Sequence, residues 1–213
     1  SGQILAVKGL GGFHLACDGC NAQAVNELRN RKLRVDKPFA VMLPDVQTVE
    51  RYCELSSDEQ CLLESPTRPI VILQQRPGTP LAPQIAPGQT TLGVMLPYTP
   101  LHTLLFTTLP GNNHTFKPPQ VLVMTSGNLS EEPIAIDNEE ARQRLANLVD
   151  AFLFHNRPIR TRSDDSVARV VPTPTPHVAM LRRSRGYTPA PIKLPWDLPP
   201  LLAAGPELKN TFC

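Results

Sequence analysis

The sequence has no apolar run that approaches the roughly 20 residues needed for a membrane-spanning helix. It does not open on a basic segment followed by an apolar one, which would indicate secretion. The five cysteines are odd in number and follow no disulfide pattern, so we expect reduced thiols in a cytoplasmic protein. Aromatic residues make up only 5% of the chain, which leaves few rings for stacking on nucleic-acid bases.

A metal site is also poorly supported. Cys17 and Cys20 form a Cys-x-x-Cys pair, which is half of a zinc site or a redox pair. A tetrahedral zinc site needs two further ligands at partner spacing, and Cys53 and Cys61 do not supply it. We therefore interpret the cysteines as small buried residues and expect no metal site in this chain.

Basic residues are present in two clusters, although the net charge is only +2. Seven of the 15 arginines lie between Arg157 and Arg185, and five basic residues lie between Arg29 and Lys37. The planar guanidinium of arginine binds phosphate or carboxylate through two hydrogen bonds at once, which lysine cannot do. The clusters are therefore either two solvated faces or two walls of an anion-binding cleft.

Hydrophobic periodicity predicts a layered α/β or α+β domain with a mixed, twisted sheet. The glycine-rich segment 8–18 matches no standard phosphate-loop pattern and is interpreted as a flexible turn lining a site. Segment 101–105 is expected to be helical, with Leu101, Leu104 and Leu105 as its apolar face. The other expected helices are 21–33, 45–53, 56–64 and 137–148, and the expected strands are 4–7, 39–43, 70–73, 92–96, 121–124, 152–154, 167–171 and 178–181.

One stretch changes character within a single residue. The apolar run 121–124, typical of a strand buried on both faces, is followed directly by Thr125, Ser126, Gly127 and Asn128. Small hydroxyl residues beside a glycine let N–H and O–H groups converge on one point, which suits an anionic oxygen such as that of a phosphate. On this stretch alone, a plain turn at the end of a strand is an equal alternative.

In the helix predicted over 21–33, one lysine is expected to point toward the core of the protein. Val25 and Leu28 form its apolar stripe, and Lys32 continues that stripe at helical spacing. An inward ammonium needs an anionic partner or loses its charge. Alternatively, the Lys32 stem covers apolar surface while its ammonium reaches water. Arg34 follows just beyond the end of the helix.

Two motifs resemble those of the YrdC-like family. Lys32-Leu33-Arg34, at a helix end before a core strand, is similar to its Lys-x-Arg motif, and Ser126-Gly127-Asn128 is similar to its Ser-x-Asn motif. Within that family, further stretches resemble the YrdC-like domain of the carbamoyltransferases that mature NiFe hydrogenases. These stretches are 8–18, 37–42, 125–130, 162–167 and 182–187.

The resemblance implies a domain organisation. Residues 3–187 would form a YrdC-like nucleotide-binding domain, a twisted mixed parallel/antiparallel sheet with flanking helices around a deep positively charged cavity. Residues 188–213 would be a proline-rich linker and, at 207–213, the first strand of a following sugar-kinase-like domain. Zinc sites are expected only in the zinc-finger domain that precedes this one in the full-length family. We therefore expect the chain to be a piece of a longer protein.

The resemblance also implies an activity. The domain would bind ATP with Mg2+ and convert carbamate, derived from carbamoyl phosphate, into carbamoyl-AMP and pyrophosphate for cyanide-ligand synthesis. Neighbouring domains of the full-length enzyme would receive the product, and a downstream maturation protein would accept the carbamoyl group on a cysteine. A cytoplasmic transferase without a membrane or nucleic-acid partner is expected.

This chemistry needs positioned positive charge and no nucleophile from the protein. Lys32 and Arg34 are therefore assigned to the phosphates, and Ser126 and Asn128 to hydrogen bonds that fix phosphate and ribose. Arg185 is the expected third cation. The other expected nucleotide contacts are Thr125, Arg162, Asp165 and Ser166; the last two either orient Mg2+ or an arginine, or belong to a plain salt-bridge network.

Two other functions stay open. Where threonine-using relatives have Arg-Val-x-x-His, this chain has Met95-Leu96-Pro97-Tyr98-Thr99. Loss of an arginine suited to an amino-acid carboxylate favours a smaller substrate, yet a threonylcarbamoyl-AMP synthase for tRNA modification is the nearest alternative. An RNA-binding module using the same basic cleft is the other.

Overall fold

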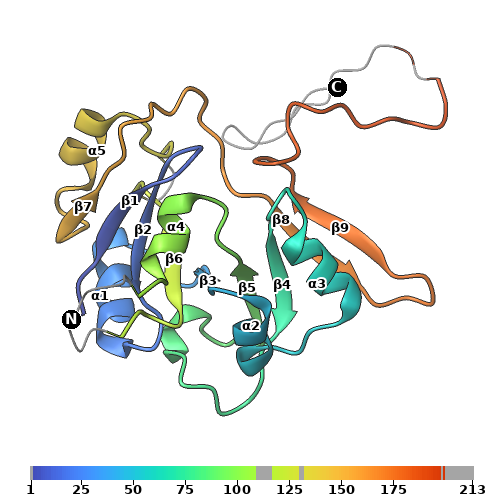
Figure 1. Cartoon of the computed structure of the whole chain (residues 1–213), viewed down its shortest axis with the longest axis horizontal. Helices are drawn as coiled ribbons and strands as arrows, with labels where there is room; N and C mark the ends of the chain where they lie inside the picture. The colour runs from blue at the N-terminus through green and yellow to red at the C-terminus, as the bar shows by residue number, and fades with distance from the viewer. Residues whose placement is uncertain (1, 109–116, 130–131, 198, 200–213) are drawn as a thin grey trace.

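The computed structural model describes residues 2–108, 117–129, 132–197 and 199. Its strands are β1 (Leu5–Lys8), β2 (Phe13–Asp18), β3 (Ala40–Met42), β4 (Ile70–Gln74), β5 (Thr91–Met95), β6 (Leu122–Ser126), β7 (Ala151–Leu153), β8 (Val167–Val171) and β9 (His177–Arg182). They form one sheet in the order β7-β1-β2-β6-β3-β5-β4-β8-β9 (Figure 1). The β1–β7, β3–β5 and β4–β8 pairs are parallel and the others antiparallel, which confirms the predicted mixed sheet.

Polar side chains cap most of the helices at their first turn. The Asn21 side chain accepts from the backbone N–H of Ala24, and Ser56 and Glu59 form the capping box that their spacing predicts. These caps satisfy N–H groups that have no partner within the helix. The helices are α1 (Ala22–Lys32), α2 (Val46–Tyr52), α3 (Ser57–Glu64), the 3-10 turn η1 (Pro83–Ile85), α4 (Pro100–Leu105) and α5 (Asn138–Leu145).

Alternation along the strands divides the core between the two faces of the sheet. Phe13, Leu15 and Val123 belong to the larger core, which takes in buried residues of α1, α2, α3 and α5. Ala16 and Met124 belong to a smaller core on the other face, where α4 packs (Figure 1). No helix in the described part of the chain is long and apolar enough to cross a membrane.

Two assignments made from the sequence are wrong. Segment 8–18 is not all turn, because Phe13–Asp18 forms the central strand β2, with Phe13 and Leu15 on one face and His14 on the other. The apolar face assigned to segment 101–105 is also wrong at one position: Leu101 and Leu105 pack against the smaller core, but Leu104 does not. Leu104 is 55% exposed, and the fully buried residue of α4 is His102.

Residues 188–197 contain no helix or strand, as predicted for a linker. The strand expected at 207–213 lies outside the described residues, so the proposed division of the chain stays a prediction.

Candidate functional site

The ammonium of Lys32 is buried against the loop that follows β6. Lys32 is 1% exposed, and its Nζ donates to the carbonyl of Ser126 at 2.7 Å, to the side-chain Oδ1 of Asn128 at 2.8 Å and to the carbonyl of Asn128. Helical spacing therefore predicted the direction of this side chain correctly. The two predicted motifs, 94 residues apart in sequence, meet through one side chain.

Burial sets the charge state of Lys32. Burial and, to a smaller extent, the nearby positive charge of Arg34 together lower the pKa of the ammonium to about 7, while Glu132 opposes the shift. A group with such a pKa gains or loses its proton near neutral pH. An anion placed beside it would favour the charged form.

The Ser126-Gly127-Asn128 loop is held by hydrogen bonds within the loop and to β2. The Ser126 hydroxyl donates to Asn128 Oδ1 at 2.7 Å. The backbone N–H of Gly127 donates to the carbonyl of Phe13 at 2.6 Å. A Cβ at Gly127 would lie 2.8 Å from Phe13 Cβ and from that carbonyl oxygen, so only glycine permits this approach. The loop is thereby fixed against β2.

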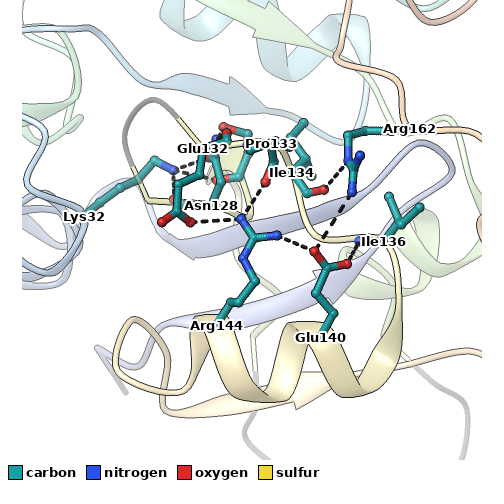
Figure 2. A network of polar contacts seen from close by, with 10 residues as sticks. Lys32, Asn128, Glu132, Pro133, Ile134, Ile136, Glu140, Arg144 and Arg162 are labelled. Carbon is teal, nitrogen blue, oxygen red and sulfur yellow. Dashed lines mark hydrogen bonds and ion pairs between the residues drawn. The ribbon is translucent and has the colours of Figure 1, made fainter. Parts of the chain in front are cut away.

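Asn128 also begins a polar network that reaches α5. Its Nδ2 donates to the carbonyl of Glu132, and the Glu132 carboxylate accepts from Arg144 at 2.9 Å (Figure 2). Arg144 donates as well to the carbonyl of Pro133 at 2.7 Å. The segment that continues from Asn128 is therefore tied to a guanidinium on α5.

Arg162 belongs to the far end of the same network. Its Nε donates to the carbonyl of Ile134 at 2.7 Å, and its guanidinium lies 3.9 Å from the Glu140 carboxylate (Figure 2). Its side chain is 44% exposed. Arg162 thus braces segment 132–140, and its role as a phosphate ligand stays a prediction.

Arg34 lies within electrostatic range of the second basic cluster, while its guanidinium donates to the carbonyls of Lys37 and Pro38. Leu33 ends α1 in the left-handed region, at φ 52°, and turns the chain so that Arg34 follows on the outside. Burial, together with the charges of Arg29 and Arg182, lowers the pKa of the Arg34 guanidinium to about 10. Arg182 is the last residue of β9, so residues of the two basic clusters lie within electrostatic reach of each other.

Asp165 joins Arg185 to β2. The Asp165 carboxylate accepts from Arg185 Nε at 2.8 Å and pairs with His14 Nε2 at 2.8 Å. Burial alone would raise the pKa of this carboxyl, but His14 and Arg185 hold it well below its usual range. Arg185 also donates to the carbonyls of Thr67 and Arg68. Asp165 therefore pairs with an arginine, which fits both a site role and a plain salt-bridge network, so its role stays a prediction.

Ser166 and Thr125 occupy different surroundings from Ser126. The Ser166 hydroxyl is buried and donates to the carbonyl of Arg185 at 2.8 Å, which fixes the turn after β9. Thr125 is buried and precedes Ser126 on β6, so its side chain points to the opposite face of the sheet. Nucleotide contact by either residue stays a prediction.

Two cavities in the described part of the molecule lie away from Lys32, Arg34 and the Ser126–Asn128 loop. A cavity of about 530 Å³ is lined by residues between Gln74 and Leu92. A second, of about 300 Å³, lies between Pro44, Arg68 and Phe106. Because neither is bounded by the Lys-x-Arg or Ser-x-Asn residues, the deep positive cavity implied by the resemblance stays a prediction.

The cysteines in the described part of the chain are of two kinds, and Cys213 lies outside it. Cys17 and Cys53 are buried, and burial raises the pKa of each thiol to about 12, which fits small core residues. Cys20 and Cys61 are exposed, so for them the interpretation as buried residues is wrong. Among the described residues no cluster of three or more histidine, cysteine, aspartate and glutamate side chains could hold a metal ion.

Sequence reasoning missed two residues of this region. His14 sat in the segment assigned to a turn, although its alternation with Phe13 and Leu15 was a signal for a strand. Arg182 was one arginine among many in its cluster, and only the pairing of β9 with β8 shows where it lies.

Sequence comparisons show which known proteins this chain is similar to. The family model of Sua5, YciO and YrdC, described as "Telomere recombination", matches residues 1–184. Carbamoyltransferase HypF2 of Cupriavidus necator is 50% identical over 218 residues, covering 100% of this chain and 27% of the relative. HypF of Rhodobacter capsulatus is 47% identical with the same coverage. The chain therefore spans about a quarter of the length of these relatives.

Solved structures are similar as well. Full-length HypF in a phosphate- and nucleotide-bound form has a TM-score of 0.82 and 47% identity, over 91% of this chain and 29% of that one. Sua5 of P. abyssi, complexed with L-threonine, has a TM-score of 0.70 and 16% identity, over 86% of this chain and 51% of that one. At that identity the likeness to Sua5 concerns the fold alone.

Proposed function

The chain belongs to the Sua5/YciO/YrdC family, and we propose that it binds ATP and joins its AMP part to carbamate, releasing pyrophosphate. The observation that carries this proposal is the contact of Lys32 with the Ser126–Asn128 loop, with Arg34 beside it. Similarity to HypF carbamoyltransferases, one of them solved with a bound nucleotide, supports carbamate as the acyl group.

The reaction forms one bond and breaks another. A carbamate oxygen attacks the α-phosphorus of ATP, and the bond from that phosphorus to the bridging oxygen breaks. Pyrophosphate leaves with the electron pair, so carbamoyl-AMP and pyrophosphate carry all the atoms of the two substrates. Two anions must meet, and preorganised positive charge lowers the barrier to this encounter.

Some residues of the site supply positive charge, and others supply hydrogen bonds that orient the nucleotide. Lys32, in its protonated form, and Arg34 supply positive charge to the phosphates, and Arg182 adds charge from the second basic cluster. The Ser126 hydroxyl and the Asn128 amide, fixed by their mutual hydrogen bond, orient a phosphate and the ribose. Their arrangement before substrate binds limits the reorganisation needed during the reaction.

No step is assigned to protein-bound Mg2+, because the described residues offer no cluster of metal-binding side chains. Mg2+ would arrive with the phosphates of ATP, as is general for phosphoryl-transfer substrates.

In the wider enzyme, carbamate would come from carbamoyl phosphate and the carbamoyl group would go on toward the cyanide ligand of a NiFe hydrogenase. Carbamoyl-AMP hydrolyses readily, so the product must pass directly to a neighbouring domain, protected from bulk water.

The test is ATP–pyrophosphate exchange by the purified chain with ammonium carbamate as the acyl substrate. Exchange that depends on carbamate, with no added threonine, is the expected result. Exchange that requires threonine as well as bicarbonate would assign the chain to the threonylcarbamoyl-AMP synthases. Tight, salt-sensitive binding of RNA without any exchange would favour the nucleic-acid alternative.

ATP binding is expected to weaken as the pH rises through about 7. Lys32 has a pKa of about 7 without ligand, and phosphate raises it, so above that pH binding takes up a proton. Affinity should fall by up to about tenfold per pH unit between pH 7 and 9. Calorimetry with MgATP in buffers of different ionisation enthalpy measures the uptake.

Lys32→Arg is the control for this titration, because a guanidinium keeps its proton over this range. The Lys32→Arg variant should show no proton uptake. Equal uptake in this variant and the wild-type chain would contradict the assignment to Lys32.

A further inference from the structure

Three aromatic side chains meet on the face of the sheet that α4 covers. The ring centroids of Tyr98 and His102 are 4.5 Å apart, those of His14 and His102 are 6.0 Å apart, and those of His14 and Tyr98 are 6.4 Å apart. The residues come from β2, from the turn after β5 and from α4. His102 is 0% exposed and His14 is 6% exposed. We call His14, Tyr98 and His102 the three-ring cluster.

Polar atoms of this cluster lack partners. In the described part of the chain, six buried side-chain nitrogen or oxygen atoms make no hydrogen bond, and four of them belong to the three-ring cluster. They are Nδ1 of His14, the Tyr98 hydroxyl and both ring nitrogens of His102. Each buried polar atom without a partner destabilises the fold, so four together are not expected in a region whose only purpose is packing.

The cluster adjoins the residues proposed to bind the nucleotide. His14 lies directly opposite Ser126 in the β2–β6 pair, so their side chains are neighbours on one face of the sheet. The Nε2 of His14 is hydrogen-bonded to Asp165, so its Nδ1 points toward the turn that contains Gly9. A Cβ at Gly9 would lie 3.1 Å from that Nδ1.

The Tyr98 ring is positioned by Arg185. The Arg185 guanidinium lies over the Tyr98 ring, 3.5 Å from its centroid. The hydroxyl lies near the charges of Asp165 and Arg185, but no hydrogen bond of acceptable geometry joins it to them. The salt bridge between Asp165 and Arg185 therefore positions two of the three rings without satisfying their free polar atoms.

We propose that His14, Tyr98 and His102 form the acyl subsite of this domain, which takes a small planar group bearing both N–H donors and anionic oxygen, as carbamate does. This assignment rests on the proposed function and names the side chains that recognise its second substrate.

The hydrogen-bonding capacity of the rings favours such a group. Burial lowers the pKa of His102 to about 3, so this imidazole is neutral and offers one N–H donor and one acceptor. The Tyr98 hydroxyl also donates and accepts. An amino group beside a carboxylate can satisfy both roles, whereas acetate and bicarbonate lack the N–H donors. The position beside Ser126 would bring the carbamate oxygen next to the α-phosphate.

The test uses two substitutions that keep the shape of the cluster. Tyr98→Phe removes only the hydroxyl and leaves the ring under Arg185. His102→Leu replaces unpartnered polar atoms with apolar ones, so the melting temperature should stay level or rise. Each is expected to raise the KM for ammonium carbamate in ATP–pyrophosphate exchange at least tenfold, with the Kd for ATP unchanged. Partial recovery of KM in His102→Gln would support recognition by hydrogen bonds.

Tyr52→Phe and His177→Gln are matched controls, on α2 and β9, and should leave both constants unchanged. An unchanged KM for carbamate in Tyr98→Phe and His102→Leu would overturn the subsite, as would a rise in the Kd for ATP equal to the rise in KM. If the wild-type chain binds ATP but shows no exchange with carbamate, the proposed function itself fails. The subsite then fails with it.

Discussion

Replacing Lys32 by methionine is expected to reduce carbamate-dependent ATP–pyrophosphate exchange by roughly 10²–10³-fold, the usual effect of removing one preorganised charge or donor. Two losses combine in this variant. The phosphates lose the cation nearest to the Ser126–Asn128 loop, and the loop loses the donor that joins it to α1. The measurement is the exchange rate at saturating ATP and carbamate.

Methionine suits this experiment better than alanine. The Lys32 side chain is almost completely buried, so alanine would leave a cavity in addition to removing the charge. Methionine fills the space of the stem. It leaves three acceptors on Ser126 and Asn128 without the ammonium, and it also removes a charge that burial penalises. We expect a net loss of about 1–3 kcal/mol, which a domain of ordinary stability tolerates.

Arg31→Met provides the control on the same helix. The Arg31 guanidinium pairs with Glu27 and Asp150 at the surface, where ion pairs contribute little. Exchange in Arg31→Met should remain close to the wild-type rate. Wild-type exchange in Lys32→Met, with the protein folded, would remove Lys32 from the site.

Local patterns predicted the features of the site that depend on one element. The spacing of Val25, Leu28 and Lys32 was sufficient to direct Lys32 inward, because helix geometry fixes which side chains share a face. In the same way, the apolar run before Ser126 was sufficient to place that residue at the end of a buried strand.

Patterns failed where tertiary contacts outweigh local preference. The glycines before Phe13 suggested a turn, but pairing with β1 and β6 makes the next six residues a central strand. In α4, hydrophobicity placed Leu104 on the buried face with Leu101 and Leu105, yet Leu104 is exposed and His102 is fully buried. Both errors concealed residues of the three-ring cluster. A buried polar residue breaks the hydrophobic pattern, and binding sites are expected at positions where such local rules are broken.

Long-range pairs could not have been derived from the chain at all. His14 and Asp165 are 151 residues apart, and the strands β2 and β8 are not neighbours in the sheet. The two residues meet because the segment before β8 reaches the turn before β2, where the Ser163 N–H donates to the Gly11 carbonyl at 3.0 Å. Sequence reasoning left Asp165 between two roles for this reason. Such a contact depends on how the whole chain is arranged, which local patterns do not specify.

Asp165→Asn is expected to destabilise the protein by about 3–5 kcal/mol at pH 7, because it leaves a largely buried guanidinium without its carboxylate. Arg185→Met should also destabilise, and the double variant should lose clearly less than the two single losses combined. Urea unfolding of the four proteins measures this coupling. Asp164→Asn, which removes one charge from the neighbouring position, should change stability by much less.

The pH dependence tests the same pair independently. The pKa of Asp165 is lowered in the folded protein, so its contribution is fully present above the unfolded value of 3.8 and is lost as the pH falls toward the folded value. The stability difference between wild type and Asp165→Asn should therefore be constant from about pH 7 to 5 and shrink below about pH 4. A difference that stays constant down to pH 3, or additive losses in the double variant, would mean that Asp165 does not hold Arg185 by charge. The Arg185 guanidinium would then lie over Tyr98 for reasons of packing alone.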